Sequence, residues 1–103
     1  MIRHIVAVRF RAGVTQGEKD ELMTDLRGLS EHIAGIQDFQ VRRNVSPEDP
    51  VVRGFHDLFW FDFRDEQVRD VYLDDKAHQA IGARLVAAAE GGVDGIFVID
   101  HEI

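Results

Sequence analysis

The stretch Gly54-Phe55-His56-Asp57-Leu58-Phe59-Trp60-Phe61-Asp62-Phe63 decides the fold of this chain. Its composition predicts a β-strand, and a period of two places apolar side chains on both faces of that strand. Because an antiparallel sheet in a small monomer normally has one solvated face, each apolar face needs a cover. We expect helices to cover one face and a second copy of the chain to cover the other. The helix-side residues would be Phe55, Asp57, Phe59, Phe61 and Phe63; the partner-side residues would be His56, Leu58 and Trp60.

The spacing of apolar residues predicts the remaining elements. Further strands are expected at 2–10, 37–44 and 95–100, and helices between Thr15 and Gly35, at 66–73 and at 76–89. Thr15 opens a capping box, and Asp65 can cap the second helix. Two prolines in 46–50 predict an irregular loop there. The helical side chains expected to face inward are Leu22, Leu26, Leu29, Ile33, Val68, Val71 and Tyr72. The apolar residues of the last helix are Ala77, Ala80, Ile81, Leu85, Val86 and Ala88.

The order strand, helix, strand, strand, helix pair, strand is that of the ferredoxin-like βαββαβ arrangement. It predicts an α+β domain with a four-stranded antiparallel sheet and all helical segments on one face. The other face then stays bare, and an apolar patch of that size is unusual on a monomer. Two such sheets packed face to face about a two-fold axis would bury it, so the sequence predicts a homodimer through the sheet faces.

The composition limits the classes of partner. A chain of 103 residues is expected to form one domain, 1–103, and 45 % hydrophobic with 30 % charged residues is typical of globular proteins. The formal net charge of −7 argues against nucleic acid and anionic membranes, since both need a basic surface. The sequence has no apolar run long enough to span a bilayer, no apolar signal-peptide core and no cysteine. A cytoplasmic location is therefore expected.

Several short motifs, spread over the whole chain, resemble one known family. They are Ile2-Arg3-His4-Ile5-Val6 followed by Phe10-Arg11-Ala12-Gly13-Val14-Thr15, then Arg43-Asn44-Val45-Ser46, Tyr72 with Ala77-His78-Gln79-Ala80, and Phe97-Val98-Ile99-Asp100. Together they resemble the stress-responsive dimeric α/β-barrel (Dabb) domains. The resemblance implies a ferredoxin-like sheet paired about a two-fold axis into a dimeric barrel. Members of that family include stress-linked proteins and a plant branch of cofactor-free polyketide cyclases that use histidines and a tyrosine.

The resemblance implies three site residues: His4, Tyr72 and His78. The chain departs from the family pattern at two places. Asp75-Lys76 stands where the family often has His-Pro, and Asp57 stands where it often has a histidine early in the third strand. His56 lies one residue before Asp57, and one step along a strand reverses the face. The sequence leaves open which of these two residues takes the place of that histidine.

We expect the candidate residues to line a pocket between the sheet and the helices. An imidazole with a pKa near neutrality could remove a proton next to a carbonyl group. Tyr72 or His78 could stabilise the resulting enolate, so His4 is the first candidate for the base. The first turn of a helix, where His78 is expected, disfavours a protonated imidazole.

Asp57 is the fourth candidate, as a group that orients His4 across the sheet. It could equally neutralise Arg43 or Arg9, because a carboxylate on an apolar face needs a partner. Structural alternatives also stay open for the others: a hydrogen-bonded core group for His4, core packing for Tyr72, and a helix-start partnership with Asp74 or Asp75 for His78.

Two classes of function follow. The first is a cofactor-independent enzyme, a cyclase, isomerase or lyase, acting on a small carbonyl compound. The second is a non-catalytic dimeric protein that binds a small apolar or carbonyl ligand or protects against stress. A cofactor-free monooxygenase rests on fold analogy alone. The five histidines lack metal-binding spacing and the glycines lack a nucleotide-binding pattern, so no metal or cofactor is expected.

Overall fold

The computed structural model, which describes residues 1–103, has the predicted order of elements. The strands are β1 (Ile2–Val8), β2 (Ile36–Arg43), β3 (Asp57–Phe63) and β4 (Ile96–Glu102). The main helices are α1 (Gln16–Gly28), α3 (Glu66–Asp74) and α4 (Lys76–Ala88). A one-turn helix, α2 (Asp49–Val52), and two 3₁₀ turns, Leu29–Glu31 and Gly92–Gly95, complete the chain.

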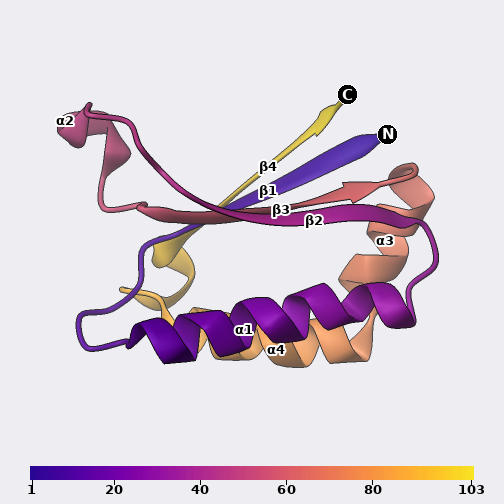
Figure 1. Ribbon diagram of the computed structural model, residues 1–103, viewed down its shortest axis with the longest axis horizontal. Coiled ribbons are helices and arrows are strands. Elements are labelled where there is room, and N and C mark those ends of the chain that lie inside the picture. Colours follow the sequence, from indigo (N-terminus) through magenta and orange to yellow (C-terminus); the bar gives the residue numbers. More distant parts are fainter.

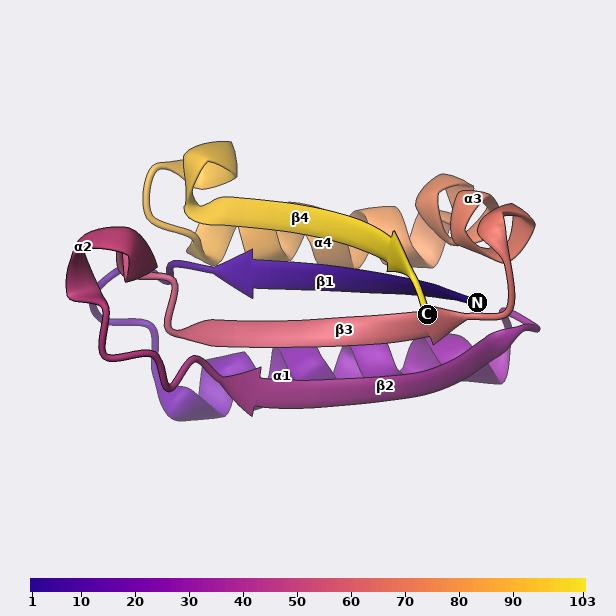
Figure 2. The same cartoon turned by 90° about the horizontal axis from the view of Figure 1, so that it is seen from above.

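The four strands form one sheet in the order β2-β3-β1-β4, and all neighbours are antiparallel. The main helices lie on one face of the sheet, α1 beneath β2 and β3 and α4 beneath β1 and β4 (Figures 1 and 2). The ferredoxin-like βαββαβ fold predicted from the sequence is therefore confirmed. None of the helices has both the length and the apolar character that a membrane span needs.

The hydrophobic core lies between the sheet and the helices. The side chains of Phe59, Phe61 and Phe63 on β3 are at most 2 % exposed, as is Tyr72 of α3. They meet an apolar stripe that begins in α1 and continues past its 3₁₀ extension. Its four predicted members are all buried: Leu22, Leu26, Leu29 and Ile33. The phenylalanine side chains of β3 therefore face the helices, as predicted.

The opposite face of the sheet has no such cover. Leu58 and Trp60 of β3 are half-buried there, and Phe97 and Ile99 of β4 are 56 % and 48 % exposed. The strand register brings these residues together through β1, because Ile5 pairs with both Trp60 and Ile99. We refer to this apolar surface, formed by Ile5, Ala7, Leu58, Trp60, Phe97 and Ile99, as the bare face.

The structure corrects the prediction for the start of the third strand. β3 begins at Asp57, so Phe55 lies outside it and does not follow its alternation. Gly54 adopts a left-handed φ of 78°, and the Phe55 ring packs 6.4 Å from the ring of Phe97 on the bare face. Phe55 was expected on the helix side, and that expectation was wrong.

Three further expectations about local structure were wrong. The predicted loop at 46–50 runs into α2, whose first turn holds Pro50, a position where the missing proline N–H is not needed. α1 ends at Gly28 rather than near Gly35, because its last turn tightens into a 3₁₀ turn. Val71 is 57 % exposed, so only two of the three inward residues predicted for α3 are buried.

We expect Gly35→Ala to destabilise the fold through a specific clash. Gly35 precedes β2 with a φ of 95°, and a Cβ there would lie 2.5 Å from Cγ2 of Val68. Gly13 is a matched control, because its φ is 92° but nothing lies within 4 Å of an added Cβ. Left-handed strain alone should lower the unfolding free energy by about 1 kcal/mol in Gly13→Ala. Overpacking should add roughly 1–3 kcal/mol in Gly35→Ala. Equal losses in urea denaturation would contradict the clash.

Candidate functional site

His4 lies on the helix-facing side of β1 and is only 5 % exposed. Its Nδ1 is 2.6 Å from Oδ1 of Asp100, the residue opposite it on β4. Nη1 of Arg69 on α3 donates to the other carboxylate oxygen of Asp100 at 3.1 Å. Because an ionised carboxylate only accepts hydrogen bonds, the neutral imidazole carries its proton on Nδ1. Nε2 of His4 is then left as a basic nitrogen.

Tyr72 of α3 joins His4 to His78. Its ring centroid lies 5.4 Å from that of His4 and 3.7 Å from that of His78, on which it stacks. The side of Tyr72 toward the sheet packs on Phe61 and Phe63, at 4.9 and 5.0 Å. One tyrosine therefore fixes two histidines that are far apart in the sequence.

The break between α3 and α4 places His78 at the start of α4. Asp75 caps α4 by accepting from the backbone N–H of His78 at 2.8 Å. The same carboxylate lies 2.9 Å from Nε2 of His32, which ties the break to the end of the α1 region. The expected partnership of His78 with Asp75 is thus a backbone contact, and Nδ1 of the His78 ring is buried with no hydrogen-bond partner.

The three residues line one cavity of about 240 Å³. Among its lining residues the only polar side chains are His4, Tyr72 and His78, and none is an acid, a lysine or an arginine. Leu73 and Val98 are 43 % and 50 % exposed and mark its mouth. The apolar walls are completed by Val6, Leu26, Phe59, Leu85, Val86 and Ile96. We refer to this space as the histidine cavity.

Burial sets the protonation states in the histidine cavity. It lowers the pKa of His4, although the hydrogen bond to Asp100 acts in the opposite direction. Burial also lowers the pKa of His78, and the nearby charge of His4 lowers it further. Burial raises the pKa of Tyr72. At neutral pH both imidazoles are therefore neutral bases, and the tyrosine hydroxyl keeps its proton.

Asp57 lies away from this cavity. Its carboxylate pairs with Nζ of Lys19 at 3.2 Å and with Nη1 of Arg43 at 3.0 Å. The pairing with Arg43 was one of the two alternatives expected from the sequence. The contact with His4 is absent because β1 places Val8, not His4, opposite Asp57. The group that contacts His4 is Asp100.

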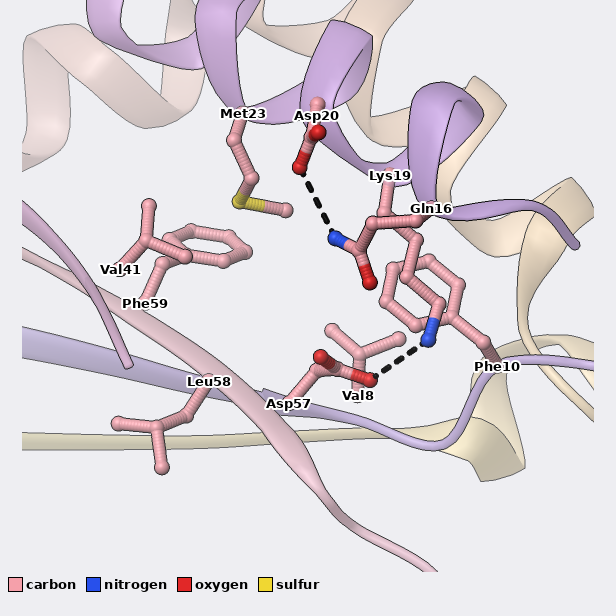
Figure 3. Close-up of a pocket in the computed structure, with 10 residues that line it drawn as sticks. All are labelled: Val8, Phe10, Gln16, Lys19, Asp20, Met23, Val41, Asp57, Leu58 and Phe59. Atoms are coloured by element: carbon pink, nitrogen blue, oxygen red, sulfur yellow. Dashed lines mark hydrogen bonds and ion pairs between the residues drawn. The ribbon is translucent and has the colours of Figure 1, made fainter. Parts of the chain in front are cut away.

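A second, smaller cavity of about 30 Å³ surrounds Asp57 (Figure 3). Lys19 and Asp20 of α1 and Asp57 of β3 form its polar rim, and the Asp20 carboxylate accepts from Nε2 of Gln16 at 2.9 Å. Its apolar lining includes Val8, Phe10, Met23, Val41 and Phe59. We refer to it as the Asp57 cavity. Nowhere in the structure do three or more His, Cys, Asp or Glu side chains gather as metal ligands do.

Sequence reasoning missed Asp100 and Arg69 as site residues. Asp100 directly follows the apolar run Ile96-Phe97-Val98-Ile99 of the last strand, and this position is the only sequence signal for it. Its link to His4 depends on the pairing of β4 with β1, at a separation of 96 residues. Arg69 has no comparable signal, because a single arginine on a short helix with acidic neighbours such as Asp70 is an ordinary surface pattern.

Comparison with known proteins agrees with this fold. Residues 2–103 match the family model of the stress responsive A/B barrel domain, Dabb. The chain belongs to the Dabb family. The predicted resemblance is therefore confirmed. No curated protein matches this Dabb domain.

Several solved structures are similar to it. A dimeric ferredoxin-like protein of unknown function from Jannaschia is 28 % identical, with a TM-score of 0.88 and coverage of 99 % of this chain and 98 % of that one. A Dabb family protein from Mesorhizobium loti is 24 % identical, with a TM-score of 0.76 and coverage of 99 % and 95 %. The hydroxynitrile lyase of Passiflora edulis is 18 % identical, with a TM-score of 0.82 and coverage of 99 % and 92 %. The last two likenesses show the fold alone.

We expect Asp100→Asn to lower the pKa of His4 further. The substitution removes the anion that favours the imidazolium and leaves Arg69, which disfavours it. The pKa can be read from the Hε1 resonance of His4 in a proton NMR titration. Asp57→Asn is the matched control and should leave the His4 titration unchanged. A shift of the same size in both variants would contradict the assignment of Asp100.

Proposed function

We propose that this Dabb domain is a cofactor-independent enzyme that moves a proton next to the carbonyl group of a small compound. The observation that carries the proposal is the histidine cavity, where two neutral imidazoles and a protonated tyrosine share an otherwise apolar space. General bases work best when their pKa lies near the working pH, and a dry site strengthens each hydrogen bond made there.

The geometry supports separate roles for the three side chains. Nε2 of His4 accepts a proton from the carbon next to the carbonyl, and Asp100 stabilises the imidazolium that forms. The electron pair of the C–H bond passes into an enolate. Tyr72 and His78 supply hydrogen bonds to the enolate oxygen. Return of the proton from His4 to carbon, or departure of a group from the neighbouring carbon, completes an isomerase or lyase reaction.

Arg69 and Asp100 act as positioning residues for His4 in this proposal. Their ion pair fixes the carboxylate, and the carboxylate fixes the tautomer and ring plane of the imidazole. The hydroxynitrile lyase of the same fold is an enzyme, which is consistent with chemistry at such a site. Cyclase, isomerase and lyase reactions share this enolate step, so one exchange experiment tests them together.

Exchange of ketone protons for solvent deuterium tests this function without knowledge of the natural substrate. We expect the protein to accelerate loss of the α-proton signal of 2-butanone in D₂O, followed by proton NMR. His4→Ala should slow the enzymatic rate by about 100-fold or more, the range of general-base catalysis. Tyr72→Phe keeps the ring packing but removes the hydroxyl, so it should also slow exchange.

Asp57→Asn is the control for this experiment and should exchange at the wild-type rate, because Asp57 lies outside the histidine cavity. Circular dichroism checks that each variant is folded. If ketones raise the melting temperature while no exchange occurs, the protein is a non-catalytic ligand-binding protein and the enzymatic proposal is wrong.

The proposal includes a homodimer formed through the bare face. Two observations support it. The large apolar side chains of Phe97 and Ile99 are exposed on the bare face, and ferredoxin-like proteins of similar structure, such as the Jannaschia protein, are dimeric. A two-fold axis would place one bare face on the other, so the same apolar residues meet in both directions. The charges at one end of this surface are already paired, since Asp62 accepts from Arg3 at 2.8 Å.

We expect Trp60→Glu to give a monomer or an aggregate in sizing chromatography with light scattering. A carboxylate in the middle of the bare face would have to be buried without a partner when the two sheets meet. Val71→Glu is the matched control, because Val71 is exposed on α3, on the other side of the sheet. An unchanged dimer in Trp60→Glu would place the interface elsewhere.

A further inference from the structure

The histidine cavity and the Asp57 cavity are neighbours along the same layer of the protein. Both lie between the sheet and the helices, the histidine cavity mainly against α3 and α4 and the Asp57 cavity against α1. Neighbouring residues of α1 and β1 contribute to both linings. Leu26 of α1 and Val6 of β1 line the first, whereas Met23 and Val8 line the second. Phe59 lines both. A single side chain therefore forms a wall shared by the two spaces.

The ring of Phe59 is held firmly in that position. It is 2 % exposed, and it packs against Phe39 at 5.8 Å and edge-on against Phe61 at 6.1 Å. Behind it, the Asp57 cavity has room for about one water molecule. In Figure 3 Phe59 and Met23 stand on one side of that space, with Lys19 and Phe10 on the other.

The size and lining of the histidine cavity restrict what can enter it. Its volume of about 240 Å³ is below the range of about 300–1,000 Å³ found for drug-sized ligands. No lysine or arginine faces it, so a carboxylate or phosphate would be desolvated without a counter-ion. A small uncharged molecule with one hydrogen-bonding oxygen fits these conditions.

We propose that Phe59 closes the inner end of the histidine cavity and limits its ligands to small neutral carbonyl compounds without a long apolar chain. The inference rests on the proposed function, because it takes the histidine cavity as the ligand site. Removal of the Phe59 ring would join the two cavities into one longer space. That space would extend along α1 from the histidines toward the Lys19–Asp57 ion pair.

Two homologous series of probes test this limit. The first is methyl ketones from 2-butanone to 2-decanone; the second is n-alkylbenzenes from toluene to hexylbenzene, which lack a carbonyl. Dissociation constants are measured for wild type and Phe59→Ala by ligand-observed NMR. In wild type we expect affinity to stop improving at a short chain length. In Phe59→Ala each further methylene should tighten binding about fourfold over lengths at which wild type gains nothing.

Phe61→Ala is the matched control. Phe61 is an equally buried phenylalanine of the same strand, but it lines neither cavity. It should show the wild-type dependence on chain length. Its affinities should fall by a similar factor at every length, because Phe61 also supports Tyr72 and the fold. If the alanine variants do not fold, Phe59→Leu and Phe61→Leu give the same comparison with a smaller volume change.

The outcomes separate this inference from the proposed function. Steady tightening through the whole series in wild type, the same length dependence in both variants, or no binding of either series to any variant would overturn the role of Phe59. If the alkylbenzenes show the expected limit while ketones have no advantage over them and undergo no deuterium exchange, the limit on length stands. In that case carbonyl chemistry is the part that fails.

Discussion

The packing of the Tyr72 ring is the interaction on which the candidate site depends. The ring packs against Phe61 and Phe63 of the sheet core and also contacts both histidine rings. Each aromatic pair of this kind contributes roughly 0.5–1.5 kcal/mol beyond the burial of its area. The same contacts that stabilise the fold therefore keep two imidazoles in an apolar environment, and a change that loosens Tyr72 would loosen the site.

This placement has an electrostatic consequence. An imidazolium in an apolar site loses its hydration, so burial favours the neutral ring unless a nearby anion compensates. For His4 the anion is Asp100, but Arg69 shares it, and burial still dominates the pKa. For His78, burial and the nearby His4 lower the pKa, and they outweigh the opposing effects of the Tyr72 backbone and the capping residue Asp75. Two bases close to one another in an apolar cavity are thus kept uncharged at neutral pH.

The fold was predictable because its main signals are local. The alternation in 57–63 and the leucine stripe of α1 each identify a buried face from a few consecutive residues or helical turns.

The site was predictable only in part. His4, Tyr72 and His78 came from family motifs, and the structure brings them together. Asp100 could not be assigned, because its contact with His4 depends on which strand lies beside β1 and in what register. Phe55 and Val71 were misplaced because alternation says nothing beyond a strand end and helical spacing says little in a helix of nine residues.

The two faces of the sheet have separate proposed roles. The helix face holds the candidate catalytic site, and the bare face forms the proposed dimer interface. The most direct test of the central claim is the protonation state of the cavity at pH 7, read from long-range ¹H–¹⁵N NMR spectra of the histidine rings in the intact protein. We expect His4 and His78 both to be neutral, with the proton of His4 on Nδ1. A doubly protonated ring at either position would contradict it.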